Sequence, residues 1–142
     1  MLTQLDMAVH FSVRRSLSSF PLPGIPIFEA EPGLRLLSLQ HNFIKRVQHL
    51  HTTHRLVFLD LYHNRLDLIS NIDSLVNLRV LMLGKNRIRR VEGLQRCNRL
   101  SVLDLHGNRI TQVRRNFKRT GAGARLRESA SRVGGSRNLA DT

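Results

Sequence analysis

The chain has 142 residues, enough for one small domain, and 41% of them are hydrophobic, which supplies ample material for a core. Lys and Arg number 23 against 10 Asp and Glu, so the formal net charge of +13 favours an acidic partner: a protein segment, a nucleic acid or an anionic membrane. A single cysteine excludes an internal disulfide, and no apolar run approaches the roughly 20 residues of a membrane helix. We therefore expect a cytoplasmic protein without a membrane span.

The first 33 residues look irregular, but part of them keeps the spacing of the regular repeats in residues 34–113. Residues 1–13 are expected to form a flexible N-terminus, with Asp6 early and the arginines late, the reverse of a secretory signal. In residues 14–33, four apolar residues each lie 22 positions before an apolar position of the first regular repeat: Leu17, Leu22, Ile25 and Phe28. This spacing predicts a degenerate repeat that caps the first regular one. The alternative is a Pro-rich leader whose spacing agrees by chance.

Residues 34–113 contain four successive copies of a 22-residue unit. An asparagine marks the same place in every copy: Asn42, Asn64, Asn86 and Asn108. With the leucines before it and the Ile or Leu after it, each copy follows the pattern LxxLxLxxNxI that is typical of leucine-rich repeats. The sequence therefore predicts an α/β leucine-rich repeat solenoid, with a parallel concave sheet and short helical or 3₁₀ segments on the convex side.

The asparagines are predicted to point inward where each strand ends. A buried amide carries two donors and an acceptor, which would satisfy the backbone of the turn and that of the next repeat. We therefore assign the four asparagines a structural role.

The pattern stops after Val113. Residues 114–142 are rich in Arg, Gly, Ala and Ser, with eight basic and two acidic residues. Such a segment cannot bury enough apolar surface to offset the entropy of ordering its backbone. It is predicted to be a disordered basic tail, which leaves the fourth repeat without a visible cap.

Every second residue of the predicted strands should face outward, onto the concave face, because successive side chains of a strand alternate. The candidate binding residues there are Leu36, Phe58, Asp60, Tyr62, Val80, Met82, Asp104 and His106. Their apolar and aromatic centre predicts a protein-binding site. The alternative is that the degenerate first repeat or the tail covers this centre.

Three arginines one period apart form a basic border beside this face: Arg65, Arg87 and Arg109. Like charges on neighbouring repeats repel, and an acidic peptide or a phosphate laid along them would relieve the repulsion. The alternative is that three flexible side chains extend separately into solvent.

The residues do not favour catalysis or metal binding. His49, His51 and His54 fall in a return loop with no second cluster to complete a ligand set. His41 and His63 are predicted stacked neighbours, two ligands short of a site. No nucleophile stands beside Asp104 and His106, and no phosphate loop or nucleophile elbow occurs. We expect no enzyme activity, no metal and no cofactor.

The repeat phrases LRLLSLQHNFIKRV, LDLYHNRLDLIS, LRVLMLGKNRIRRVEGL and LSVLDLHGNRITQV resemble the SDS22-like class of leucine-rich repeats. Within it they look similar to the family of the leucine-rich repeat subunit of the tubulin polyglutamylase complex. That resemblance implies a non-catalytic scaffold that helps to place a glutamylating ligase on microtubules, in a cytoskeletal or ciliary setting. The family has more repeats and lacks an Arg/Gly tail, and both departures suggest a fragment or a mis-spliced gene model.

Two other functions stay open. One is a phosphatase-regulating scaffold like the SDS22 protein, and the other is an RNA-associated adaptor, which would use the basic tail. The expected partner is a protein, with tubulin or another polyglutamylase subunit as the candidates that the resemblance implies. A nucleic acid bound through the tail is the second, less favoured class of partner, and no membrane partner is expected.

Overall fold

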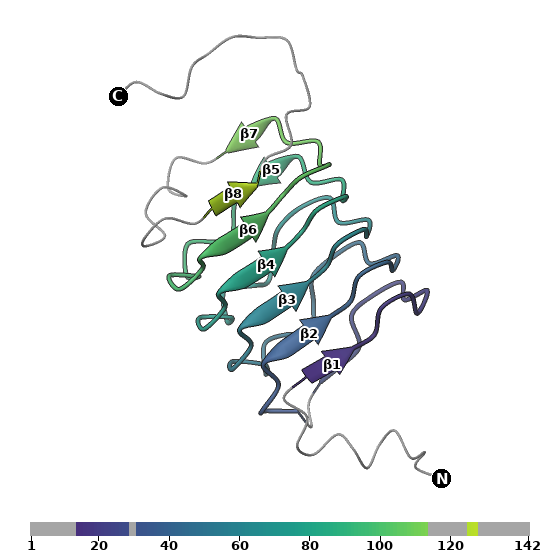
Figure 1. Cartoon of the computed structure of the whole chain (residues 1–142), viewed down its shortest axis with the longest axis vertical. Coiled ribbons are helices and arrows are strands. Elements are labelled where there is room, and N and C mark those ends of the chain that lie inside the picture. The colour runs from purple at the N-terminus through teal and green to yellow at the C-terminus, as the bar shows by residue number, and fades with distance from the viewer. Residues whose placement is uncertain (1–13, 29–30, 114–124, 128–142) are drawn as a thin grey trace.

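The computed structural model describes residues 14–28, 31–113 and 125–127, which form a ladder of short parallel strands with one strand of the main sheet per turn (Figure 1). The main sheet contains, in spatial order, β1 (Arg14–Ser16), β2 (Leu36–Ser38), β3 (Phe58–Asp60), β4 (Val80–Met82), β6 (Val102–Asp104) and β8 (Arg125–Arg127). A second sheet pairs β5 (Arg90–Val91) with β7 (Gln112–Val113). The predicted parallel sheet is confirmed.

The register of the main sheet follows the sequence period. Leu36 lies opposite Phe58, Phe58 opposite Val80, and Val80 opposite Val102, each step being 22 residues. Equivalent residues of successive repeats therefore form straight rows across the sheet. A side chain that suits one turn meets the same kind of neighbour on the next, which is how a repeat protein stacks its units.

The core is a set of leucine rows behind the sheet. Along β2 the middle residue Leu37 is fully buried, while Leu36 and Ser38 on either side are partly exposed, as the alternation of a strand requires. The same inward places are buried in all four repeats: Leu34, Leu37, Leu39, Leu56, Leu59, Leu61, Leu78, Leu81, Leu83, Leu100, Leu103 and Leu105.

The convex side differs from the expectation of short helical or 3₁₀ segments, because the described residues contain neither. Each return segment instead makes two separate turns. The Leu75 N–H donates to Ile72 O at 3.0 Å, and the Leu78 N–H donates to Leu75 O at 3.0 Å. The two turns meet at Leu75 and do not continue into a regular helix. In the described part of the chain, no helix is long and apolar enough to cross a bilayer.

The first turn is held by an ion pair as well as by apolar contacts. Ile25 and Phe28 lie in the core, with Leu17 and Leu22 packed against it, and β1 pairs with β2 in register. Two positions depart from the leucine pattern: Arg15 lies opposite Leu37, and the carboxylate of Glu31 is buried beneath it.

Both contacts of that pair use one carboxylate oxygen of Glu31. Its Oε1 accepts hydrogen bonds from Arg15 Nε at 2.9 Å and from Arg15 Nη2 at 2.6 Å. The Glu31 side chain is 3% exposed and the Arg15 side chain 22%. The Glu31 Oε2 atom is buried without a hydrogen-bond partner. This turn is thus a polar variant of the repeat.

Strand β8 corrects part of the expectation for the C-terminal tail. The sequence predicts disorder for Arg125–Arg127, yet these residues pair in parallel with β6, with Leu126 opposite Leu103. The step from Leu103 to Leu126 is 23 residues, one more than the period, so a search at 22 passes over it. The remaining residues of 114–142, and the expected flexible residues 1–13, lie outside the described part of the chain.

Backbone with a positive φ recurs at two positions of the repeat, and at Gly93 this conformation restricts the side chain most. Its φ is +75°, and a Cβ there would lie 2.9 Å from Ile69 O. In the preceding repeat the same place holds Asn71, whose Nδ2 donates to Val47 O at 2.8 Å.

Gly93→Ala is therefore expected to lower the free energy of unfolding by about 1–2 kcal/mol, from backbone strain and the carbonyl contact. Gly33→Ala is the matched control, since nothing lies within 4 Å of a Cβ at Gly33. Urea unfolding of both variants measures the difference. Equal losses would contradict the strained conformation of Gly93.

Candidate functional site

The predicted concave residues lie in three rows on the outer face of the main sheet, and the third row contains Tyr62 and His106. The first row is Leu36, Phe58, Val80 and Val102, all partly exposed. The second is Ser38, Asp60, Met82 and Asp104. Seven of the eight candidates are partly exposed, whereas Asp104 is only 4% exposed. The alternation of the strands predicted the rows, but not the burial of Asp104.

A cavity opens at the N-terminal end of the first row. Its volume is about 270 Å³, and it is lined by Arg14, Arg15, Leu36, Leu37, Ser38 and Phe58. The lining residues come from β1, β2 and β3, which the sheet holds in place. Such a recess fits one apolar side chain of a partner, because most small-molecule and side-chain sites are apolar hollows with a few polar groups.

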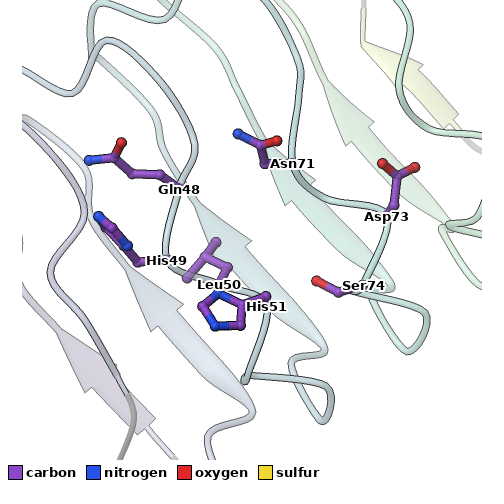
Figure 2. Close-up of a pocket in the computed structure, with 7 residues that line it drawn as sticks. All are labelled: Gln48, His49, Leu50, His51, Asn71, Asp73 and Ser74. Carbon is purple, nitrogen blue, oxygen red and sulfur yellow. The ribbon is translucent and has the colours of Figure 1, made fainter.

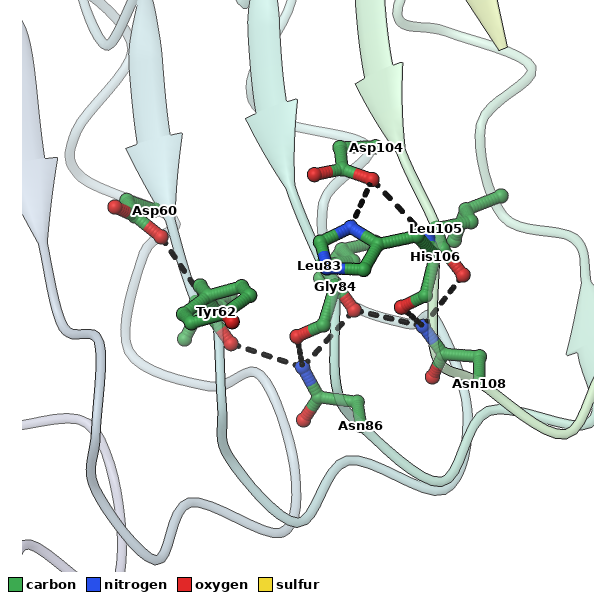
Figure 3. Close-up of polar contacts among 10 residues, drawn as sticks. Asp60, Tyr62, Leu83, Gly84, Asn86, Asp104, Leu105, His106 and Asn108 are labelled. Carbon is green, nitrogen blue, oxygen red and sulfur yellow. Dashed lines mark hydrogen bonds and ion pairs between the residues drawn. The ribbon is translucent and has the colours of Figure 1, made fainter. Parts of the chain in front are cut away.

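The third row forms an aromatic cluster around Tyr62. Its ring centre lies 5.5 Å from that of His41 in an edge arrangement, and 5.6 Å from that of His106. Gly84 lies on the rung between Tyr62 and His106 (Figure 3). A Cβ on Gly84 would stand 2.5 Å from His106 Cε1 and 3.1 Å from Tyr62 Cδ2. The missing side chain therefore lets the two rings approach each other.

His41 and His63 join this cluster from the turn that follows each strand. Their Nδ1 atoms lie 2.7 Å apart, so one ring donates a hydrogen bond to the other. The sequence predicts that these residues lie side by side but does not link them with Tyr62. The sequence signal is their shared position, since each directly precedes a ladder asparagine. The backbone φ of both histidines is positive.

The two aspartates of the second row are held in the same way but have different surroundings. Asp60 Oδ1 accepts a hydrogen bond from the Tyr62 N–H at 2.9 Å, and Asp104 Oδ1 accepts one from the His106 N–H at 3.1 Å (Figure 3). Asp104 Oδ1 also contacts His106 Nδ1 at 2.7 Å.

Burial raises the pKa of Asp60, and the charge of Asp104 adds to that rise. The backbone hydrogen bond from Tyr62 and the charge of His41 act in the opposite direction. Because the net shift is upward, the ionised form of Asp60 is disfavoured relative to a carboxylate in water.

The basic border is one column of exposed side chains. Arg65, Arg87 and Arg109 are each anchored by a backbone N–H bonded to the preceding repeat. Phe43 begins the same column, and the Arg65 guanidinium lies over its ring at 4.3 Å from the centroid. That cation–π contact holds Arg65 in place, so the border is partly ordered without a partner.

Asn42, Asn64 and Asn86 of the asparagine ladder are buried as predicted, but the bonds between turns reach the preceding repeat rather than the next. Asn86 Oδ1 accepts from the Leu66 N–H at 2.9 Å, and Asn86 Nδ2 donates to Leu61 O at 2.9 Å. The same two bonds recur for Asn42, Asn64 and Asn108. Asn108, on the last regular turn, is partly exposed.

Comparison with known proteins agrees with this geometry. Residues 76–118 match the family described as Leucine Rich repeats (2 copies). The crystal structure of internalin C2 from Listeria monocytogenes superposes with a TM-score of 0.73 at 18% identity, over 80% of this chain and 50% of that one. A second Listeria internalin superposes with a TM-score of 0.51 at 19% identity, over 69% and 31%. The fold is a leucine-rich repeat solenoid.

Two curated relatives are similar in sequence over part of this leucine-rich repeat chain. Human Leucine-rich repeat-containing protein 49 is 48% identical over 65 residues, which are 46% of this chain and 10% of the relative. The mouse protein of the same name is 48% identical over 48 residues, 34% of this chain and 7% of the relative. The matched segments thus span a tenth or less of the relatives' length.

The return side of the leucine-rich repeats carries a hollow of about 320 Å³ (Figure 2). It is lined by Gln48, His49, Leu50, His51, Asn71, Asp73 and Ser74. No cluster of three or more His, Cys, Asp or Glu that could hold a metal ion occurs among the described residues. His49, His51 and Asp73 line the hollow but do not form such a cluster.

Cys97 lies in the core of the solenoid at the place that Leu75 takes one repeat earlier. It is fully buried, and its Sγ lies 3.7 Å from Ile72 O. Burial, with a smaller effect of Asp73, raises the pKa of the Cys97 thiol to about 11. The nucleophilic thiolate is therefore scarce at neutral pH.

Proposed function

We propose that this protein is a non-catalytic scaffold that binds a protein partner on its concave face. The observation that carries the proposal is the partly exposed apolar row of Leu36, Phe58, Val80 and Val102, which ends in the cavity beside Phe58. The sheet beneath fixes these side chains, so little conformational entropy is lost when a partner covers them. The protonated, buried thiol of Cys97 supports a role without chemistry.

The finer proposal concerns the partner. The resemblance to the polyglutamylase subunit family supports tubulin or another subunit of that complex, in the cytoplasm on the cytoskeleton or at the cilium. The column of Arg65, Arg87 and Arg109 complements an acidic segment such as a tubulin tail. An acidic run beside the concave face would therefore add to the apolar contact.

Phe58→Ala is expected to weaken tubulin binding about tenfold or more, chiefly through faster dissociation, because Phe58 walls the cavity and fills the centre of the row. Interferometry with the immobilised full chain measures both rates. Val76→Ala is the matched control, because Val76 is 47% exposed in a return segment off the sheet. Equal effects of the two variants, or no binding by the unchanged chain, would contradict the proposal.

Replacing Arg65, Arg87 and Arg109 together by Ser is expected to act on association instead. The association rate should fall about tenfold at low salt and lose much of its salt dependence, because exposed charges steer the encounter. Tubulin stripped of its acidic tails should show no difference between the unchanged chain and the triple variant. An RNA oligonucleotide and a phosphatase catalytic subunit serve as competing probes, and tighter binding to either would favour that alternative function.

A further inference from the structure

Asp60 stands out on the concave face because of its charge. Residues 34–113 carry 13 basic and five acidic side chains, yet the two outward rows of these repeats contain only the carboxylates of Asp60 and Asp104 as charged groups. Arg14 on β1 and Arg125 and Arg127 on β8 continue these rows at the two ends of the sheet, so the face is acidic only in its middle part. A cationic group of a partner would find its opposite charge there.

Of the two carboxylates, Asp60 is the one still open to a ligand. Asp104 is buried and contacts His106 Nδ1. Asp60 belongs to neither of the ion pairs Arg15–Glu31 and His106–Asp104 of the described residues. Its Oδ1 accepts the Tyr62 N–H, which fixes the carboxylate in place beside the Tyr62 ring.

Tyr62 supplies the second half of a cation site. The chain's own Lys85 places its Nζ 5.7 Å from the centre of the Tyr62 ring. The ring is therefore already oriented to receive positive charge, since an ammonium or guanidinium within about 6 Å of a ring centre is attracted to its face. Lys85 itself is an exposed side chain on the turn after β4.

We propose that the concave face binds an extended segment of its partner, with a Lys or Arg side chain seated between Asp60 and Tyr62. An apolar side chain of the same segment occupies the cavity beside Leu36 and Phe58. This rests on the proposed function and names the chemistry of the partner. Phe58 and Asp60 are two residues apart on β3, about 7 Å, so the two anchors are two or three residues apart in an extended chain.

The ionised form of Asp60 is not expected to stabilise the fold. Because burial raises the pKa of Asp60, its charge opposes folding at neutral pH, and that loss disappears as the pH falls below the ordinary aspartate value of 3.8. Asp60→Asn keeps an oxygen for the Tyr62 N–H and should melt at the same or a higher temperature at pH 7.

The experiment selects 12-residue peptides from a random display library on the immobilised full chain and measures selected peptides by fluorescence anisotropy. We expect enrichment of Lys or Arg two or three residues from a large apolar residue. Asp60→Asn should weaken these peptides about tenfold, since a charge-assisted contact on a desolvated face is lost. Asp67→Asn is the matched control, because it removes the same charge from an exposed place on the same repeat. It should change the affinity less than twofold.

The outcomes separate this inference from the proposed function. Selected peptides that lose affinity with Phe58→Ala but respond alike to Asp60→Asn and Asp67→Asn would overturn the cation site and leave the concave scaffold standing. Enrichment of Asp and Glu would overturn it too, in favour of contact through the basic border alone. Peptides indifferent to both Phe58→Ala and Asp60→Asn, or no enrichment at all, would overturn both proposals. A lower melting temperature of Asp60→Asn would assign Asp60 a structural role.

Discussion

Asn86→Leu is expected to lower the free energy of unfolding by about 3 kcal/mol, because the buried Leu66 N–H loses its acceptor while Leu61 O and Leu83 O each lose one of their donors. The Leu66 N–H loses its acceptor at 2.9 Å, and Leu61 O loses a donor at 2.9 Å. The side chain also donates to Leu83 O at 3.1 Å within its own turn. Water cannot replace these bonds, since Asn86 is only 6% exposed.

Urea unfolding followed by circular dichroism measures this loss. Arg87→Ala, at the next residue, is the control and should change stability by about 0.5 kcal/mol at most, because Arg87 is an exposed surface side chain. Asn108→Leu should cost less than Asn86→Leu, because Asn108 is partly exposed and water reaches its partners. Equal midpoint shifts for Asn86→Leu and Arg87→Ala would refute the buried ladder.

Arg15→Ala is expected to cost about 3 kcal/mol, because it strands the buried carboxylate of Glu31 without a counter-charge. Both hydrogen bonds to Glu31 Oε1 come from Arg15, and Oε2 has no partner to take over. The loss should fall on the N-terminal turn, where amide hydrogen exchange around Ile25 and Phe28 should accelerate first.

The double variant Arg15→Leu with Glu31→Leu tests whether the ion pair itself stabilises the fold. Arg15→Leu gives the first turn the leucine that the next turn carries at the equivalent position, Leu37. Glu31→Leu places a leucine at the position that Leu75 takes in a later turn. Replacing a buried ion pair by apolar side chains of similar size is commonly neutral or stabilising. We therefore expect the double variant to match or exceed the unchanged chain in thermal unfolding. A double variant as unstable as Arg15→Ala would show that the pair makes a net contribution.

The sequence by itself determined the repeat geometry of this protein. Asn42, Asn64, Asn86 and Asn108 recur at one fixed step, and a strand that repeats at one step must stack in one register. Alternation then places Leu37 inward and Leu36 outward without reference to any distant residue. For this reason the parallel sheet, the leucine core and the rows of the candidate site follow from local pattern alone.

Only the tertiary structure decided where neighbouring turns depart from that pattern. The contact of Tyr62 with His106 depends on Gly84 between them, and the pairing of Arg15 with Glu31 joins residues 16 positions apart. Strand β8 joins the sheet one residue out of step, because backbone hydrogen bonds need only an extended segment within reach of the open edge of β6. These contacts depend on which side chains meet between neighbouring turns. The repeat pattern of the sequence predicts the regular positions but not the positions that depart from it.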